Sequence, residues 1–322
     1  AAASGRAARP SPHVMVYSGP DLGLNGPTGA TYAGGRLWIT NYGDNSVSEF
    51  GWRSAADPSV HAGPGYMFAE PSAITSGRRH IWVANLLAST VTELNVADGS
   101  VVRTIRNVRT PRALALFDGR LWIANSGTDS VSEYSVRTGR LITVVRGDGF
   151  DRPEALAVSN GLLWVANGQA GSVTVLNAAT GAWRATLRGP RLALREPMAE
   201  VASRTRLWVA SRDSGSITEI STVSLRMLRR IAGPRYRLDG PVAMVLAGGD
   251  VWVADIYGNS VTQISATTGR LVKVLGAPRY RFDHPAGIAA YHNRIWVTNN
   301  DNASVTELRL PRRHRTGAAA RR

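Results

Sequence analysis

The sequence predicts an all-β fold, a seven-bladed β-propeller with four-stranded antiparallel blades. Seven tryptophans recur at spacings of 40 to 44 residues, at Trp38, Trp82, Trp122, Trp164, Trp208, Trp252 and Trp296. A proline lies eleven residues before each of them, at Pro27, Pro71, Pro111, Pro153, Pro197, Pro241 and Pro285. Repeats of this length, divided by turn signals into four short strand candidates, are typical of propeller blades.

The third repeat shows the four strands that we expect in each blade. They lie at residues 113–116, 121–124, 130–135 and 141–146, and Gly119, residues 125–127 and Gly139 mark the turns between them. Every position of the second strand is apolar, so both of its faces must be buried, as they are between blades stacked around an axis. A glycine or alanine stands two residues after each blade proline, which suits an innermost strand where the blades converge.

The seventh repeat lacks a fourth strand. Residues 286–290, 294–299 and 304–310 supply three strands, and a basic segment follows. We expect residues 13–18 to complete this last blade and close the ring, which removes the exposed sheet edges of an open array. The predicted domain is one propeller over residues 13–310, between a disordered N-terminal tail, residues 1–12, and a disordered basic C-terminal tail, residues 311–322.

The chain is strongly basic. It has 322 residues, with 38 lysines and arginines against 23 acidic residues and a net charge of +15, and Lys273 is its only lysine. Codon bias in a GC-rich genome explains an arginine excess without any function, whereas a positive field of this size also attracts polyanions. No apolar run approaches the roughly 18 residues of a membrane span. Without cysteine, neither disulfides nor thiolate chemistry are expected.

The N-terminal segment bears on location. The chain begins with Ala1, and residues 1–12 lack the apolar core of a secretory signal. Either a signal has been removed or the sequence is trimmed. We expect an exported protein, secreted, periplasmic or at the cell surface, with the cytoplasm as the alternative, and we expect a monomer.

The repeats resemble those of bacterial propellers. Leu-Trp-Val-Ala-Asn at residues 163–167, Ser-Val-Thr-Glu-Leu at 304–308 and Thr-Gly-Arg-Leu at 138–141 are similar to YVTN-type repeats, to NHL repeats and to the repeats of the virginiamycin B (streptogramin) lyase family. The resemblance covers residues 14–310 and implies a seven-bladed propeller. YVTN-type propellers include binding proteins as well as enzymes, so the resemblance specifies the blade better than the activity.

The lyase resemblance implies magnesium-linked catalysis by histidines directly after the blade prolines, with a glutamate nearby. This sequence departs from that pattern. The seven positions hold Thr28, Ser72, Arg112, Glu154, Met198, Val242 and Ala286, and none is histidine. The resemblance therefore predicts the fold but not lyase chemistry.

Glu200 is one candidate functional residue. It lies three residues after Pro197, where every other repeat has an apolar residue. A carboxylate at such a buried position needs a partner or a proton. We weigh a structural ion pair with an arginine against a role in a binding site.

A second group of candidates lies within one residue of a blade proline and so near the axial mouth. Its members are Arg112, Arg152, Glu154, Glu196 and His284. Glu154, Glu196 and Glu200 are candidate ligands of magnesium or calcium, hard cations that prefer oxygen. The alternative is that the two arginines neutralise Glu154 and Glu196. We expect no cofactor, with magnesium or calcium as the second possibility.

The second strand ends in a near-complete ring of carboxamides. Its members are Asn41, Asn85, Asn125, Asn167 and Asn299, and Ser211 and Asp255 interrupt it. Such asparagines either line a ligand mouth or stabilise turns by bonding to their own backbone, and their recurrence favours turns. Asp255 and Arg212, which follows Ser211, are further candidate ligand contacts.

The third strands carry recurring glutamates. These are Glu49, Glu93, Glu133, Glu219 and Glu307. We expect them to form a solvated ladder with arginines such as Arg140 on a neighbouring strand.

Arginines crowd the loops that enter the blades. Two loops share the sequence Pro-Arg-Tyr-Arg, which supplies Arg235, Tyr236 and Arg237 in one and Arg279, Tyr280 and Arg281 in the other. Tyrosine between arginines suits stacking and phosphate contacts with single-stranded nucleic acid or another polyanion. The alternative is intramolecular stacking of arginine on tyrosine.

Together these observations favour a non-catalytic propeller that binds a partner on the loop face around its axial mouth. The partner is a protein, a small molecule or a polyanion. A cation-dependent lyase or lactonase-like enzyme at the axis is the second hypothesis. The third is binding of single-stranded nucleic acid or acidic polysaccharide through the arginine-rich loops.

Overall fold

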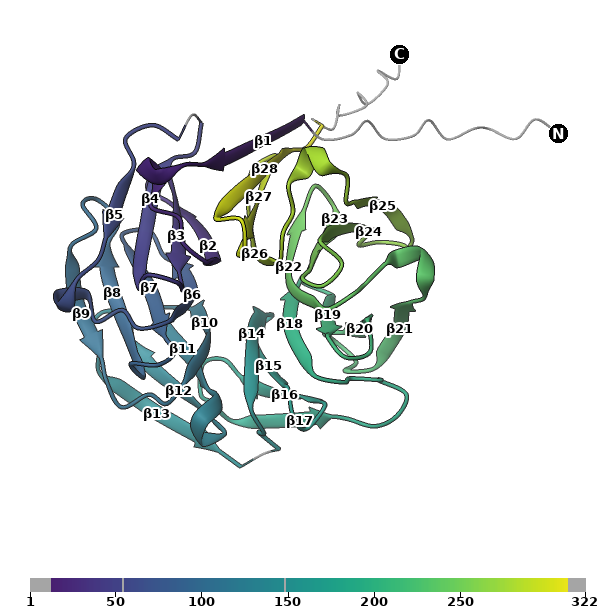
Figure 1. Cartoon of the computed structure of the whole chain (residues 1–322). Helices are drawn as coiled ribbons and strands as arrows, with labels where there is room; N and C mark the ends of the chain where they lie inside the picture. Colours follow the sequence, from purple (N-terminus) through teal and green to yellow (C-terminus); the bar gives the residue numbers. More distant parts are fainter. Residues whose placement is uncertain (1–12, 54, 148, 312–322) are drawn as a thin grey trace, which may run out of the picture.

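Seven four-stranded antiparallel sheets are arranged around a common axis (Figure 1). The computed structural model describes residues 13–53, 55–147 and 149–311. These residues confirm the predicted all-β seven-bladed propeller, and none of their helices is long or apolar enough to cross a membrane. Apart from Pro311, the two predicted tails lie outside the described residues.

Six blades follow one another along the chain, each from its innermost strand outward. The first three comprise β2 (Pro27–Ala33), β3 (Arg36–Asn41), β4 (Ser46–Gly51) and β5 (Ser59–His61); β6 (Pro71–Ser76), β7 (His80–Asn85), β8 (Thr90–Asn95) and β9 (Val101–Ile105); and β10 (Pro111–Phe117), β11 (Arg120–Asn125), β12 (Ser130–Ser135) and β13 (Leu141–Arg146). The next three comprise β14 (Pro153–Ser159), β15 (Leu162–Asn167), β16 (Ser172–Asn177) and β17 (Trp183–Leu187); β18 (Pro197–Ala202), β19 (Arg206–Ser211), β20 (Ser216–Ser221) and β21 (Met227–Ala232); and β22 (Pro241–Ala247), β23 (Asp250–Asp255), β24 (Ser260–Ser265) and β25 (Leu271–Leu275). Single-turn 3-10 helices lie in the loops, at η1 (Pro20–Leu22), η2 (Pro64–Tyr66), η3 (Ser126–Thr128), η4 (Pro234–Tyr236) and η5 (Pro278–Tyr280).

The seventh blade joins the two ends of the propeller. Its strands are β26 (Pro285–Tyr291), β27 (Arg294–Asn299), β28 (Ser304–Arg309) and, on the outside, β1 (His13–Ser18). β1 pairs antiparallel with β28 from His13 opposite Arg309 to Ser18 opposite Ser304. Figure 1 shows β1, in purple, beside the yellow β28. This arrangement is the predicted closure, and it satisfies the outer edge of β28 with a full strand.

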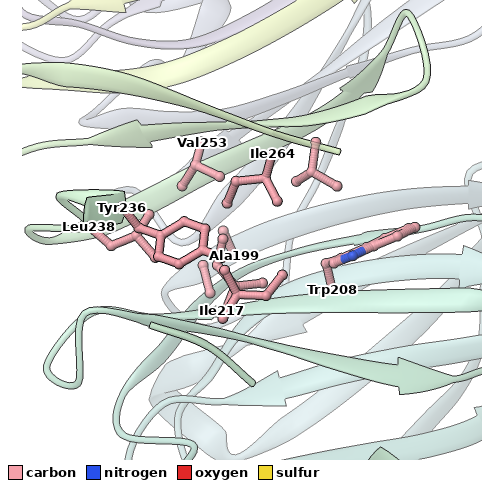
Figure 2. Close-up of a cluster of buried hydrophobic side chains, with 10 residues drawn as sticks. Ala199, Trp208, Ile217, Tyr236, Leu238, Val253 and Ile264 are labelled. Atoms are coloured by element: carbon pink, nitrogen blue, oxygen red, sulfur yellow. The ribbon is translucent and has the colours of Figure 1, made fainter. Parts of the chain in front are cut away.

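The hydrophobic core lies between the blades. At the interface of the fifth and sixth blades, Trp208 and Ile217 pack against Val253 and Ile264 (Figure 2). The same arrangement recurs around the ring, and at the closing interface Trp296 packs in one cluster with residues of β3 and β4. All seven repeat tryptophans are at most 2% exposed. Each blade is therefore covered on both faces, as the apolar second strands predict.

The third-strand glutamates are buried, so the expected solvated ladder is wrong. Glu219 is fully buried and pairs with Arg206 and, at 2.8 Å, with Nε of Arg229. Glu133 pairs with Arg120 on the adjacent strand rather than with Arg140. The reason is that the third strand of each blade is covered by its neighbours, so its carboxylates are neutralised from flanking strands instead of by solvent.

Candidate binding site at the axial mouth

The rim of the mouth is built from an unusual backbone conformation. The residue before each blade proline has a positive φ, and in five blades it is not glycine but Glu70, Thr110, Arg152, Glu196 or His284. Its carbonyl accepts a hydrogen bond from the loop after the second strand, as from Gly168 to Arg152 at 2.8 Å. The blade-entry loops and the loops between the second and third strands thus meet on one face, which we call the loop face. A left-handed conformation costs on the order of 1 kcal/mol for a residue other than glycine.

An axial cavity of about 500 Å³ opens at this rim and is lined by all seven blades. Residues directly after the blade prolines form its mouth ring, which comprises Thr28, Ser72, Arg112, Glu154, Met198, Val242 and Ala286. Two residues further along each strand lies the inner ring, which comprises Ala30, Ile74, Leu114, Leu156, Glu200, Met244 and Ile288. Glu200 is thus the single polar side chain of an otherwise apolar ring.

The charged candidates of three adjacent blades contact one another at the mouth. Arg152 lies between two glutamates, with its Nε 2.9 Å from Oε1 of Glu154 and its Nη2 2.6 Å from Oε1 of Glu196. Arg112 extends the series on one side, 3.6 Å from Glu154. Arg212 extends it on the other, with a 2.9 Å hydrogen bond from its Nε to Oε2 of Glu196. We call these five residues the mouth ion-pair network; it is the ion-pair alternative considered for Glu154 and Glu196.

Gly168 makes room for this network. A Cβ atom at this position would lie 2.8 Å from Cγ of Glu154 and 3.3 Å from Nε of Arg152. Burial raises the pKa of Glu196, but hydrogen bonds with Arg212, Asp213 and Arg152 and the charge of Arg212 outweigh it and hold the pKa below its ordinary value. The network therefore keeps Glu196 ionised at neutral pH.

Glu200 has no such partner. Both of its carboxyl oxygens are shielded from solvent, and neither has a hydrogen-bond partner of good geometry among the described residues. Burial raises the pKa of Glu200 well above its usual range, while the backbone N–H of Ala157 on the fourth blade acts in the opposite direction. Burial thus favours the protonated form of this side chain, and no arginine of the described residues neutralises it.

The candidate metal ligands are not brought together as a cation site. Glu154 and Glu196 are neutralised by arginines, and Glu200 lies deeper in the cavity. Within the described ranges, the group of acidic and histidine side chains close enough to share an ion is a different one, Asp283, His284 and Asp301. His284 lies on the seventh blade, outside the mouth ion-pair network, with its Nδ1 2.8 Å from Asp301.

The ring of carboxamides is buried and does not line the mouth. Nδ2 of Asn85 donates to the hydroxyls of Thr90 and Thr92, at 3.0 Å each, and the other four asparagines also donate to two hydroxyls of their third strand. Their role is structural, as favoured, but the main partners are these hydroxyls and not their own backbone. Asp255 is fully buried and bonded to Thr262 at 2.8 Å, so it is not available to a ligand.

The two Pro-Arg-Tyr-Arg loops show intramolecular stacking. Arg235 lies 4.8 Å from the ring centroid of Tyr236, and Arg279 lies 4.7 Å from that of Tyr280. Both tyrosines are buried, at 4% and 1% exposure, so their rings are not free to stack on a base. Arg235, Arg237, Arg279 and Arg281 remain exposed, and polyanion binding through them stays a prediction.

Two features of the loop face were not predicted. Tyr42 and Tyr257 are 42% and 59% exposed in loops after second strands, and Leu87 is exposed in a third such loop. A cleft of about 800 Å³ between the fourth and fifth blades is lined by Arg188, Arg195 and Arg230 (see below). The tyrosines and the leucine were visible in the sequence as large side chains in loops that otherwise hold mostly small or polar residues. The cleft required the spatial arrangement of two blades.

Comparison with known proteins supports the fold. No protein-family model matches the sequence, and no curated protein matches it. The structure of virginiamycin B lyase from Staphylococcus aureus matches with a TM-score of 0.78 at 16% identity, over 93% of this chain and 99% of that one. A streptogramin B lyase structure matches with a TM-score of 0.75 at 16% identity, over 94% and 98% of the two chains.

A propeller of another kind is equally similar. The WD40 repeats of RRP9 match with a TM-score of 0.77 at 13% identity, over 94% of this chain and 100% of that one. Likeness at such identities shows the fold alone. The same architecture thus serves an enzyme and a WD40 repeat protein, and function must be argued from the site.

Proposed function

We propose that this protein is a non-catalytic binding propeller that holds a segment of a protein partner on its loop face, over the axial cavity. The mouth ion-pair network carries the proposal. It fixes charged groups from three blades against one another, so the mouth presents its polar groups in a set geometry. Preorganised polar groups beside a concave, largely apolar cavity are typical of binding sites.

The exposed rim residues suggest how the partner is held. A hydrogen bond with Glu70 and burial raise the pKa of Tyr42, and the charge of Arg112 acts in the opposite direction. Tyr257 lies near Arg212. Aromatic and arginine side chains are the types that dominate binding energy at protein interfaces. Because Tyr42, Leu87 and Tyr257 come from the first, second and sixth blades, they suit an extended segment better than a compact small molecule.

Selection from a displayed peptide library tests this proposal. Peptides selected on the wild-type protein should bind a Tyr42→Ala, Tyr257→Ala double variant at least tenfold more weakly, which is about 1.4 kcal/mol. A matched control replaces Leu141 and Ile142, exposed on the outer strand β13, with alanine and should leave affinity unchanged. If the outer-strand variant loses binding while the loop-face variant keeps it, the proposal fails.

Polyanion binding is a second candidate function, favoured by the cleft of Arg188, Arg195 and Arg230. None of these guanidinium groups lies within 4.0 Å of a carboxylate of the described residues. Free cations in a cleft suit phosphate or sulfate groups. Affinity for heparin or single-stranded DNA should then fall steeply with salt. It should weaken when these three arginines, or Arg235, Arg237, Arg279 and Arg281, are replaced by glutamine; salt-insensitive binding would contradict this function.

The cation-dependent lyase or lactonase hypothesis has weaker support. Three arginines at the mouth oppose a hard cation at Glu154 and Glu196. A thermal shift with magnesium or calcium that disappears in Glu200→Ala would nevertheless favour it. If neither ion changes the unfolding temperature of the wild type, the hypothesis has no remaining basis.

A further inference from the structure

The strongest unexplained feature of the molecule is Glu200 in the axial cavity. Its side chain lines the cavity and is partly exposed there, yet both carboxyl oxygens are shielded. The carboxyl group therefore lies in the wall of the cavity, next to the space that a ligand would fill.

No structural role accounts for a carboxyl group here. Of the strands packed against β18, β14 carries Glu154, which is paired with arginines, and β19 carries Arg206, which is paired with Glu219. β15 and β22 carry no ionisable side chain. An unpartnered buried carboxyl group is less stable than a hydrogen-bonded one or an apolar side chain of similar size. The other six repeats fill this position with apolar side chains and avoid that cost.

We propose that the axial cavity binds an ammonium group on an aliphatic stem, with the carboxylate of Glu200 as its counter-ion and the apolar inner ring around the stem. Glu200 lies two residues deeper than the mouth ring, roughly 7 Å along the strand at about 3.3 Å per residue. A stem of about four carbons, the length of a lysine side chain, spans that depth.

The donor count favours ammonium over guanidinium. An ammonium group has three N–H donors, whereas a guanidinium has five, and the inner ring offers one carboxyl group and otherwise apolar side chains. An ammonium group in the cavity would therefore leave fewer of its N–H donors without partners than a guanidinium group would.

Two sources offer this chemistry, a free aliphatic amine and a lysine side chain of the partner. The second deepens the proposed function and rests on it. Two probes separate them: 1-aminopentane, and a capped tripeptide Gly-Lys-Gly compared with the same peptide acetylated on its lysine. Binding of the amine alone identifies a small molecule, and binding of the unmodified peptide identifies a side chain.

Calorimetry of the full protein tests the site. The wild type should bind at least one ammonium probe and should not bind 1-pentanol or the acetylated peptide. Glu200→Gln, which keeps the shape but loses the charge, should weaken binding at least tenfold. Because burial raises the pKa of Glu200 in the free protein, binding of a cation should be accompanied by proton release, measured in buffers of different ionisation enthalpy. Affinity should therefore rise with pH.

Control variants keep the outcome decisive. Asp21→Asn removes an exposed carboxylate outside the axial cavity and should leave proton release intact. Equal affinity of wild type and Glu200→Gln for the probes, or binding of 1-pentanol as tight as that of 1-aminopentane, overturns the inference. If that happens while the Tyr42 and Tyr257 substitutions still weaken selected peptides, the proposed function stands without it.

Discussion

The phenol of Tyr17 donates a hydrogen bond of 2.6 Å to Oε2 of Glu307, 290 residues later in the chain. Both groups are buried, and Glu307 also pairs with Arg294 and Arg309. The first strand of the propeller is thus tied to its neighbour by a charge-assisted side-chain bond as well as by the backbone ladder, and the ring is closed by both.

Removing that hydroxyl should weaken the closure. In Tyr17→Phe the buried carboxylate loses a donor, and the free energy of unfolding should fall by about 1 to 3 kcal/mol. Urea unfolding followed by tryptophan fluorescence measures the change. Tyr257→Phe, at an exposed position, should change stability by less than about 0.5 kcal/mol. Equal effects of the two substitutions would show that the bond does not contribute to closure.

The closing interface depends on Trp296. Its replacement by alanine leaves a large cavity between the seventh and first blades, and stability should fall by about 3 to 5 kcal/mol. Trp183, on the outer strand β17, is 53% exposed, and Trp183→Ala should cost less than about 1 kcal/mol. Calorimetric melting of both variants gives the comparison. A loss at Trp183 as large as that at Trp296 would contradict a core located between blades.

Asp255 takes the place of an asparagine and should behave as a protonated one. In the second blade, Asn85 donates to Thr92, which in turn donates to the carbonyl of Tyr66 at 2.7 Å. The hydroxyl of Thr262 is within donating distance of both Oδ2 of Asp255, at 2.8 Å, and the carbonyl of Tyr236, at 3.0 Å, and its single proton cannot fully serve both acceptors, so a proton on Asp255 would complete the set. Burial raises the pKa of Asp255 well above its usual range, in agreement.

The pH dependence of Asp255→Asn follows from that shift. The unfolded chain ionises Asp255 above pH of about 4, whereas the folded protein keeps the proton to higher pH, so wild-type stability falls as pH rises through this window. The Asp255→Asn variant has no carboxyl group at this position, so its stability should not fall for this reason as pH rises. It should match the wild type near pH 3 and exceed it by at least about 1 kcal/mol at pH 7. Asp21→Asn, at an exposed site, should show no such gain; a pH-independent difference at Asp255 would refute the argument.

Glu196 should show the opposite sign. Its pKa is lowered in the folded protein, so its stabilising effect is present above the ordinary carboxyl pKa and is lost as pH falls through the folded value. Glu196→Gln should be less stable than the wild type by about 1 kcal/mol at pH 7 and indistinguishable from it in acid. Asp21→Asn, at an exposed site outside the mouth ion-pair network, serves as the control, measured by thermal melting over the same pH series.

The mouth ion-pair network is expected to require a glycine at position 168, because a larger residue would not leave room for it. Because a Cβ would meet the stem of Glu154 at 2.8 Å, Gly168→Ala should displace Glu154 or Arg152 and cost about 1 kcal/mol. At Gly65 a Cβ would meet nothing within 4 Å, and Gly65→Ala should be nearly neutral. A crystal structure of Gly168→Ala with an unchanged mouth ion-pair network would disprove the requirement.

Much of the fold could be predicted because it rests on local, repeated patterns. The spacing of tryptophan and proline counts the blades, the apolar second strands require burial on both faces, and the missing fourth strand of the last repeat predicts the closure by residues 13–18. Each of these signals is contained within about one blade of sequence, where periodicity and turn chemistry act.

The site was only partly predictable, because its interactions cross from blade to blade. The sequence identified Arg112, Arg152, Glu154, Glu196 and Glu200 as departures from the repeat, but not which of them pair. Arg152 pairs with two glutamates on different blades, and no local sequence pattern contains the distances that bring the three side chains together.

For Glu200, too, the sequence predicts the position but not the surroundings of the side chain. Its sequence position predicts a buried carboxyl group, while only the tertiary structure shows that no cationic side chain of the described residues pairs with it and that it lies in the wall of the axial cavity. The repeat pattern by itself thus determined the ring, its closure and its core, because hydrophobic periodicity predicts which faces of each strand are buried. The tertiary structure alone decided which charges are neutralised, because electrostatic partnership depends on distances between residues some 40 positions apart in the chain.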